Sequence, residues 1–355
     1  MMAQTRGLRI LIATVRVPFV DGGAEAHATG LRNALLEAGH RAEIVSVPFK
    51  WYPPQCILDQ MLACRLLDLR AAGDTPVDCL IGLKFPAYLI PHPNKVVWVL
   101  HQHRQAYDLW QQPMGDLHRL PHGAEVRDAI HRADAELLPE ARRLFANSRN
   151  VAARMQTYCG IQAAPLYHPP PDAPKFHGGA AEEFLYFPSR LNALKRQRLV
   201  IDALAHTRAK VRVCFSGPDI DPGYHESCMA LARRNKLRSR VEWLGTTSEE
   251  AKRDLYARCL GVVFPPLDED YGYVTLEAML ARKPVVTCED SGGPLEFIAH
   301  RETGLVSEPT PQGLADAMDE LWEDRDNARR WGEAGRQRYS DLRIDWGTVL
   351  EKLLQ

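Results

Sequence analysis

The sequence has no long hydrophobic run, and no stretch approaches the roughly 18 consecutive apolar residues that a membrane-spanning helix needs. Its amino-terminal segment, residues 1–17, turns into a strand-like run that Arg16 interrupts, and it has no cleavage region of the signal-peptide kind. We therefore expect a cytoplasmic protein.

An excess of charge is also missing, because 44 lysine and arginine residues are balanced by 45 aspartate and glutamate residues. Nothing in this balance directs the chain to nucleic acid. The eight cysteines form no CxxC pair and mostly lie in apolar runs. We therefore expect buried free thiols in place of disulfides or a zinc site.

The 355 residues are 45% hydrophobic and 25% charged, an ordinary content for a globular protein, and this length favours two domains over one. The three consecutive prolines Pro169–Pro171 cannot join the interior of a sheet, and strand and helix patterns alternate on both sides of them. We predict α/β domains at 1–170 and 171–340. A carboxyl-terminal helix is expected within 341–355, with packing back on the first domain as one option.

The first domain begins with the pattern of a doubly wound sheet. A strand-like run at 8–14 is followed by a glycine loop, a helical pattern that stops at Gly39, and a second strand at 42–47. Gly22 and Gly23 lie in that loop, at the carboxyl end of the first strand. The GxGxxG phosphate fingerprint is absent, so a simple tight turn is an alternative reading.

The rest of the first half supplies further strands, expected at 78–83, 95–100 and 144–148. Between Asp108 and Arg143 the pattern is helical, with polar interruptions at 111–113 and 121–123. His101 follows the second of these strands, where its side chain could donate to a substrate hydroxyl or phosphate. With His103 it could also hold a metal, but no third ligand is evident nearby.

Residues 49–69 mix aromatic, apolar and basic side chains. An amphipathic helix here could lie on a membrane surface, or it could cover the edge of the sheet. Burial against the domain is the favoured alternative.

The second half repeats the alternation, with strands expected at 184–188, 211–216, 241–244, 261–264 and 284–288. Arg190 and Lys195 follow the first of these strands. Arginine grips two oxygens at once and lysine supplies a point charge, so the pair suits a diphosphate, although surface cations without a role are common. Asp219 and Asp221 resemble a metal-binding DxD motif, but a turn rich in Asp, Pro and Gly is the simpler interpretation.

The stretch 268–296 combines a polar loop, a helix, a strand and a second glycine loop. Glu269 lies in the first loop, Gly272 permits a backbone turn, and Glu277 falls in the first turns of the helix. Such units place polar side chains and free helical N–H groups at one edge of a sheet, where anionic ligands collect.

Two doubly wound domains that face each other would leave a cleft between the carboxyl ends of their strands. There Arg190 and Lys195 would face the helix that begins with Tyr273, Val274 and Thr275. Together these groups form a metal-free cage for two phosphates, which would stabilise a departing nucleoside diphosphate. A carboxylate at Glu277 could accept from the vicinal hydroxyls of a ribose, and Glu269 could reach a sugar.

At this point the sequence resembles the retaining glycosyltransferases of family 4, which have the GT-B fold. The resemblance covers nearly the whole chain and is carried by the following motifs: the EX7E pattern from Glu269 to Glu277, LEAMLARKPVV, Gly292-Gly293 with Glu296, Thr303-Gly-Leu, SRLNALK, WLG at 243–245, DGGAE, GH at 39–40, and ANS at 146–148 followed by HPPP. Tyr271-Gly-Tyr273 replaces the commoner Phe-Gly-Leu, and Ser189 replaces a common glycine.

The resemblance implies transfer of a hexosyl group from a nucleoside diphosphate sugar to a glycan, lipid-linked or small-molecule acceptor, with retention at the anomeric carbon. It implies front-face transfer with no metal or other cofactor, and His101, Glu269, Arg190 and Lys195 as catalytic residues. The donor-binding residues that it implies are Gly23, Arg190, Lys195, Gly217, Leu244, Gly272, Tyr273, Val274, Thr275 and Glu277.

Two other functions stay open at the level of sequence. A sugar nucleotide epimerase or a phosphorylase could share this fold, although EX7E argues against the epimerase and no cofactor lysine motif supports a pyridoxal-dependent phosphorylase. A non-catalytic sugar nucleotide binding protein is the third interpretation, and the intact set of site residues argues against it.

Overall fold

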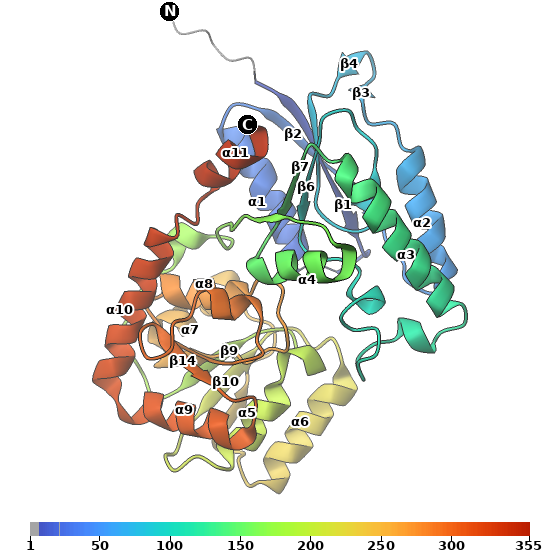
Figure 1. Ribbon diagram of the computed structural model, residues 1–355. Helices are drawn as coiled ribbons and strands as arrows, with labels where there is room; N and C mark the ends of the chain where they lie inside the picture. Colours follow the sequence, from blue (N-terminus) through green and yellow to red (C-terminus); the bar gives the residue numbers. More distant parts are fainter. Residues whose placement is uncertain (1–6, 21) are drawn as a thin grey trace, which may run out of the picture. The chain divides into compact units, whose positions relative to one another are not determined.

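A computed structural model describes residues 7–20 and 22–355. Contacts divide these residues into two units (Figure 1). The first unit consists of the chain up to Pro171 together with Asp345–Gln355, and the second unit is Asp172–Ile344. None of the helices in the described residues combines the length and apolar character that crossing a membrane requires.

The first unit is built on a parallel sheet with the strand order β2-β1-β5-β6-β7-β8. Its strands are β1 (Arg9–Arg16), β2 (Arg41–Pro48), β5 (Cys79–Gly82), β6 (Lys95–Val99), β7 (Arg143–Ala146) and β8 (Ala164–Pro165), and β3 (Ala71–Ala72) and β4 (Thr75–Pro76) form a separate hairpin. In the register of the sheet, Ile12 is paired with Ile44 on one side and Ile81 on the other.

Helices cover both faces of this sheet; they are α1 (Gly23–Glu37), α2 (Gln55–Leu66), α3 (Gly123–Leu137), α4 (Arg149–Cys159) and α11 (Trp346–Leu354). Leu35 of α1 and Leu353 of α11 share one buried cluster with Ile12 and Trp98. On the other face, a second cluster joins the strands to α2, α3 and α4; it includes Val97, Val99, Ile57, Ile130 and Met155. The last helix of the chain therefore belongs to the core of the first unit.

The second unit contains another parallel sheet, with the order β11-β10-β9-β12-β13-β14. Its strands are β9 (Leu185–Pro188), β10 (Val213–Ser216), β11 (Val241–Trp243), β12 (Gly261–Val263), β13 (Val285–Cys288) and β14 (Gly304–Ser307). All residues of β9, β10, β12 and β13 are buried, as expected for parallel strands covered on both faces.

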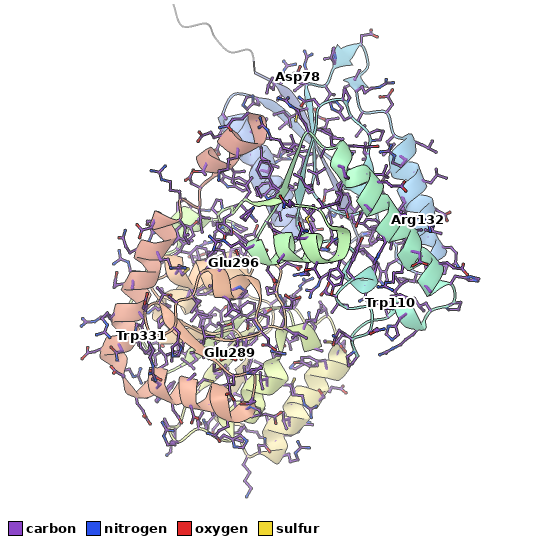
Figure 2. The ribbon with its side chains drawn as sticks, in the orientation of Figure 1. Asp78, Trp110, Arg132, Glu289, Glu296 and Trp331 are labelled. Atoms are coloured by element: carbon purple, nitrogen blue, oxygen red, sulfur yellow. The ribbon has the colours of Figure 1, made fainter. Side chains whose placement is uncertain are left out.

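The helices of this unit are α5 (Gln197–Leu204), α6 (Pro222–Arg234), α7 (Glu249–Arg258), α8 (Tyr273–Leu280), α9 (Pro311–Glu323) and α10 (Arg325–Asp341). Ser248 caps α7 through its Oγ, which accepts from the Ala251 N–H at 3.1 Å. Leu314, Met318 and Leu321 line the buried face of α9, as their spacing predicts. On α10, Trp331 is buried (Figure 2).

The expected helical pattern between Asp108 and Arg143 is wrong in its first half. Residues 108–122 form turns and a short 3-10 segment, and α3 begins only at Gly123. Pro113 limits helix formation there, and the chain folds back so closely that a Cβ at Gly115 would lie 2.1 Å from the backbone oxygen of Leu109.

The eight cysteines are free thiols, and six of them are buried. Asp219 and Asp221 take part in the turn that begins α6. Oδ1 of Asp221 accepts from the Tyr224 N–H at 3.0 Å, and Oδ2 of Asp219 lies 2.8 Å from Nδ1 of His225. Asp221 therefore acts as a helix cap.

Candidate functional site

The strand order of the second sheet reverses between β9 and β12, because β10 and β11 lie on one side of β9 and the later strands on the other. Open parallel sheets bind ligands outside the carboxyl ends of the strands at such a switch point. The loops after β9 and β12 are joined there by a hydrogen bond of 2.8 Å from the Leu267 N–H to the Leu194 oxygen. This edge is the candidate site of the second unit.

Lys195 and Glu269 meet at this edge, where the lysine ammonium donates to Oε2 of Glu269. Their side chains are 14% and 21% exposed, so the pair is shielded but still reaches solvent. Asn192 orients the lysine by accepting its backbone N–H at 3.1 Å, and the ammonium lies 5.5 Å from the centre of the Phe264 ring. The fold thus brings together two predicted site residues that are 74 positions apart.

The loop after β9 carries two more cations in different environments. Arg196 makes two hydrogen bonds of 2.7 Å to the carboxylate of Asp290, which follows β13. Arg190 is exposed, and its backbone oxygen accepts from Nε2 of Gln197 at 3.0 Å. Arg196 therefore links the loop after β9 to the loop after β13. The guanidinium of Arg190 is exposed to solvent and can approach an anion.

Glu277 is only 5% exposed, and both of its carboxylate oxygens have partners on α7. Lys252 donates to Oε1 at 3.1 Å, and the Tyr256 hydroxyl donates to Oε2 at 2.7 Å. Burial opposes the charge of Lys252, but Glu277 and Glu249 outweigh it, so the pKa of this lysine is raised. Since an ionised carboxylate has about four acceptor positions, Glu277 keeps capacity for ligand hydroxyls.

The amino-terminal end of α8 depends on Gly272, whose φ of 85° lies in the left-handed region. A Cβ at this position would also lie 3.0 Å from the Pro294 ring. Tyr273 and Val274 follow and are half-buried, while Thr275 is fully buried. The first N–H groups of such a helix suit an anionic ligand.

Gly217 and Leu244 lie at the carboxyl ends of β10 and β11. Gly217 has a φ of 134°, and a Cβ there would fall 2.2 Å from the Ser189 oxygen. The loops after β9 and β10 can approach so closely only because this residue is glycine. Leu244 is half-buried, and its N–H donates to the Phe215 oxygen at 2.9 Å.

In the first unit, the predicted residues His101 and Gly23 follow β6 and β1 at the carboxyl edge of their own sheet. His101 is half-buried, with Nδ1 at 2.7 Å from the backbone oxygen of Gln102. Gly23 is exposed and begins α1. Asp21 of the predicted glycine loop lies outside the described residues. The roles of His101 and Gly23 toward a sugar or phosphate stay predictions.

A buried carboxylate adjoins the loop of His101. Asp134 of α3 accepts hydrogen bonds from the hydroxyls of Tyr88 at 2.9 Å and Tyr107 at 2.7 Å, and Gln102 also bonds to it. Burial raises the pKa of Asp134 to about 6, although these donors act in the opposite direction. The network anchors the side chain of Gln102, whose backbone oxygen contacts His101.

His103 packs its ring near Phe49 and Phe85, with ring centres 6.0 and 5.5 Å away. Burial, followed by the charges of His101 and Lys84, lowers the pKa of His103 to about 4. Across residues 7–20 and 22–355, no three His, Cys, Asp or Glu side chains are grouped so that they could hold a metal ion.

Comparison with known proteins adds independent findings. Residues 174–338 match the family model for glycosyl transferases group 1. The chain is 36% identical over 110 residues to alpha-1,3/1,6-mannosyltransferase ALG2 of Dictyostelium discoideum, a match that covers 31% of this chain and 26% of that protein. It is 25% identical over 186 residues to O-antigen chain mannosyltransferase C of Escherichia coli, covering 52% and 48%. The matches thus span less than half the length of these curated relatives.

Among solved structures, Anabaena Alr3699/HepE in complex with UDP and glucose is similar to this chain with a TM-score of 0.71 at 19% identity, over 97% of this chain and 98% of that one. The fold is GT-B. The predicted α/β class, with two Rossmann-like domains, is thereby confirmed. The likeness to the solved structure extends over nearly the full length of the chain, whereas the family model matches the second unit alone.

Two features of the candidate site were not predicted from the sequence. One is the pair Lys252 and Tyr256, whose spacing of four residues on a helix places both on the face that meets Glu277. The other is the ion pair of Arg196 with Asp290, which joins residues 94 positions apart. The i,i+4 spacing was a usable signal, whereas the long-range pair had none.

Proposed function

We propose that this GT-B protein is a retaining glycosyltransferase of the family 4 type, using a nucleoside diphosphate sugar as donor and requiring no metal ion or other cofactor. The contact between Lys195 and Glu269 at the switch point carries the proposal. In such a donor the second phosphate is bonded to the sugar. A cation for the diphosphate and an acceptor for the sugar hydroxyls must therefore be neighbours.

The other residues fit the remainder of the donor. Arg190 is the exposed guanidinium of the same loop and would add a bidentate contact to the diphosphate. The N–H groups at Tyr273 and Val274 would bind phosphate oxygens, and Glu277 would accept from the ribose hydroxyls while Lys252 keeps it oriented.

Donor binding would also rearrange the central ion pair. The diphosphate offers Lys195 a more highly charged partner than one carboxylate, so Glu269 would be released to accept from sugar hydroxyls. Charge then grows on the departing diphosphate, and Lys195 and Arg190 stabilise it more strongly in the transition state than in the ground state. Front-face transfer needs no carboxylate nucleophile on the opposite face of the sugar, and His101 is proposed to face that sugar.

Mannose is the first sugar to test, because both curated relatives named above are mannosyltransferases. We propose a hexosyl donor and a glycan, lipid-linked or small-molecule acceptor, in the synthesis of a polysaccharide or related glycan. A cytoplasmic location is part of the proposal.

Residues 49–70 are proposed to make peripheral contact with the inner face of a membrane. Tyr52 and Leu66 are 56% and 75% exposed, and Leu62 lies one turn before Leu66 on α2. The flanking cation Lys50 would favour anionic lipid, whereas Arg70 is paired with Asp68. Flotation with vesicles should recover the protein only when anionic lipid is included; equal recovery with neutral vesicles or none would reject this contact.

A panel of nucleotide sugars tested by thermal shift identifies the donor, because a ligand of the folded state raises its melting temperature. Release of nucleoside diphosphate is then measured with and without candidate acceptors. Release that depends on an acceptor supports a transferase. An epimerase would convert the sugar without release, and a binding protein would do neither.

A further inference from the structure

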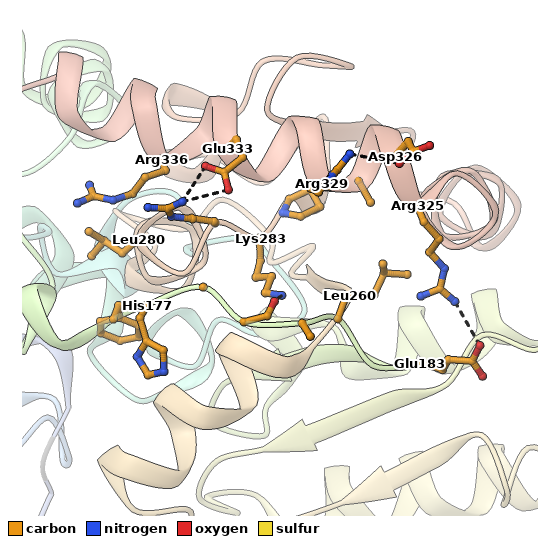
Figure 3. A pocket seen from close by; sticks show the side chains of 18 residues that line it. His177, Glu183, Leu260, Leu280, Lys283, Arg325, Asp326, Arg329, Glu333 and Arg336 are labelled. Carbon is orange, nitrogen blue, oxygen red and sulfur yellow. Dashed lines mark hydrogen bonds and ion pairs between the residues drawn. The ribbon is translucent and has the colours of Figure 1, made fainter.

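A large cavity lies in the second unit away from the proposed donor site. Its volume is about 1110 Å³, and it lies between residues 176–183, the turn after α8, and α10. Leu260 and Pro284 line it directly before β12 and β13, so it adjoins the amino ends of these strands. Figure 3 shows Arg329 and Arg336 of α10 along one side and His177 on the other. Lys195 and Glu269, by contrast, follow the carboxyl ends of strands.

Lys283 places a buried ammonium on the wall of this cavity. The residue is 5% exposed, and its ammonium donates to the backbone oxygen of Gly179 at 3.0 Å. In the described part of the chain it forms no ion pair with a carboxylate. Cys259 does not neutralise it, because burial raises the pKa of that thiol to about 12.

Burying the Lys283 ammonium without an anionic partner costs free energy. A lysine ammonium has three donors, and buried charges in proteins are normally paired. Burial accordingly lowers the pKa of Lys283. An anion in the cavity would supply the missing countercharge and acceptors.

The rim of the cavity adds positive charge. Besides Lys283, four arginines line the cavity against three carboxylates, those of Glu183, Asp326 and Glu333. The carboxylates are engaged with arginines at 3.7, 3.5 and 3.2 Å. Arg336 instead contacts Oγ of Ser340 at 3.4 Å and lies over the Tyr339 ring, so its charge has no acidic partner in the described residues.

The wall of the cavity is also partly apolar. Phe176, Leu260, Leu280 and Pro284 line it, and all four are buried. The segment opposite α10 carries small residues from Gly178 to Ala181, and a Cβ at Gly179 would lie 2.9 Å from the Ala257 oxygen. A side chain at Gly179 would collide with that backbone, whereas glycine lets the segment pass with its own oxygen bonded to Lys283.

We propose that this cavity binds a phosphate-bearing ligand with a compact apolar part, at a site separate from that of the sugar nucleotide. Lys283 and Arg336 contact the phosphate, and the apolar part lies on Leu260, Leu280 and Pro284. The phosphate could belong to a soluble metabolite or to a lipid headgroup.

The test removes the donor site first, because that site also binds phosphate. Calorimetry with inorganic pyrophosphate is carried out on the full chain carrying Arg190→Ala and Lys195→Ala. One pyrophosphate should bind per chain, and adding Lys283→Met or Arg336→Gln should weaken it at least tenfold. Lys210→Met, at an exposed lysine outside the cavity, should leave it unchanged. Thermal unfolding checks that each variant is folded.

Vesicles containing phosphatidic acid form the second arm. Pyrophosphate binding without vesicle binding assigns a soluble ligand, and vesicle binding that Lys283→Met abolishes assigns a lipid headgroup. The proposal is overturned if neither probe binds the donor-site variant. It is also overturned if binding is insensitive to both Lys283→Met and Arg336→Gln in folded proteins.

Discussion

Tyr256 decides how Glu277 presents its carboxylate. Its hydroxyl donates to Oε2 at 2.7 Å, and burial followed by the charge of Glu277 raises the pKa of Tyr256 well above its usual range, so it remains a donor. A buried carboxylate held by a fixed donor is oriented before a ligand arrives, which reduces the cost of binding.

Tyr256→Phe should therefore weaken nucleotide sugar binding by about tenfold, the effect of losing roughly 1.5 kcal/mol in a hydrogen bond to a charged group. Calorimetry measures the affinity. Tyr186→Phe is the matched control, because its ring centre is 5.1 Å from that of Tyr256 and its hydroxyl instead bonds to Ser216 Oγ at 2.6 Å. An equal loss in both variants would assign the effect to packing and remove Tyr256 from the site.

Asp134 gives the first unit a pH dependence with a defined sign. Its pKa is about 6 in the folded protein and 3.8 ordinarily, so the folded state binds the proton more tightly than the unfolded state. Its contribution to the free energy of unfolding is fully present below pH 4, falls as the pH rises to 6, and is constant above that. The shift corresponds to about 3 kcal/mol.

Asp134→Asn should remove this decline, because an amide can keep hydrogen bonds to Tyr88 and Tyr107 but does not titrate. Denaturant unfolding of the wild type and the variant between pH 4 and 7 measures the difference. A difference curve that is flat over this range would show that Asp134 does not titrate as described.

The elements were predicted best where burial leaves a simple pattern. Strands β1, β2, β5, β6, β7 and β9 to β13 lie within a few residues of their predicted ranges, since each is a short apolar run, whereas β8 and β14 were not predicted. The Ser248 side chain caps α7, and Gly160, with a φ of 66°, ends α4. Helix α6 was missed because only Cys228, Leu231 and Ala232 of its residues are buried. Its apolar periodicity is correspondingly weak.

Helix α10 packs closely against the backbone after α8 at Gly332. A Cβ at Gly332 would lie 2.1 Å from the backbone oxygen of Arg282, whereas a Cβ at Gly335 would have 3.6 Å to Met279 Cγ. The two glycines lie on the same helix and differ in the space around them.

Gly332→Ala should destabilise the second unit by roughly 1–3 kcal/mol, because backbone must move to relieve the contact. Gly335→Ala should be neutral or stabilising by up to about 1 kcal/mol, since alanine favours a helix over glycine. Denaturant unfolding monitors both variants. The packing described for α10 would be contradicted if Gly335→Ala were the more damaging change.

At the scale of the whole molecule, the chain returns to the first unit after completing the second. Leu353 of α11 is fully buried in the cluster that includes Leu35 of α1, and the Arg143 guanidinium donates to the Lys352 backbone oxygen at 3.0 Å. The stability of the first unit therefore depends on the last eleven residues.

Leu353→Ala should cost about 2–5 kcal/mol, and hydrogen exchange should show the loss in α1 and β1 but not in α9. Lys352→Ala is the control, because that side chain is exposed and the backbone bond to Arg143 survives. If Leu353→Ala reduced protection in α9 alone, α11 would stabilise the second unit, which would contradict its assignment to the first.

The site could be predicted from the sequence only in part. Lys195, Glu269 and Glu277 could be named because each follows a recognisable strand. Lys252, which donates to Glu277, and Asp290, which binds the neighbouring Arg196, come from other elements, and only the fold brings these pairs together.

The central claim is that Glu277 and its neighbours bind a nucleoside diphosphate sugar. Calorimetry of the donor found in the thermal shift panel, with wild type, Glu277→Ala and Glu249→Ala, tests it most directly. Glu249 shares Lys252 with Glu277, at 2.8 Å, but is exposed and is assigned no ligand contact. The account predicts one donor per chain, at least tenfold weaker binding in folded Glu277→Ala, and unchanged binding in Glu249→Ala. Unchanged affinity in folded Glu277→Ala would contradict it.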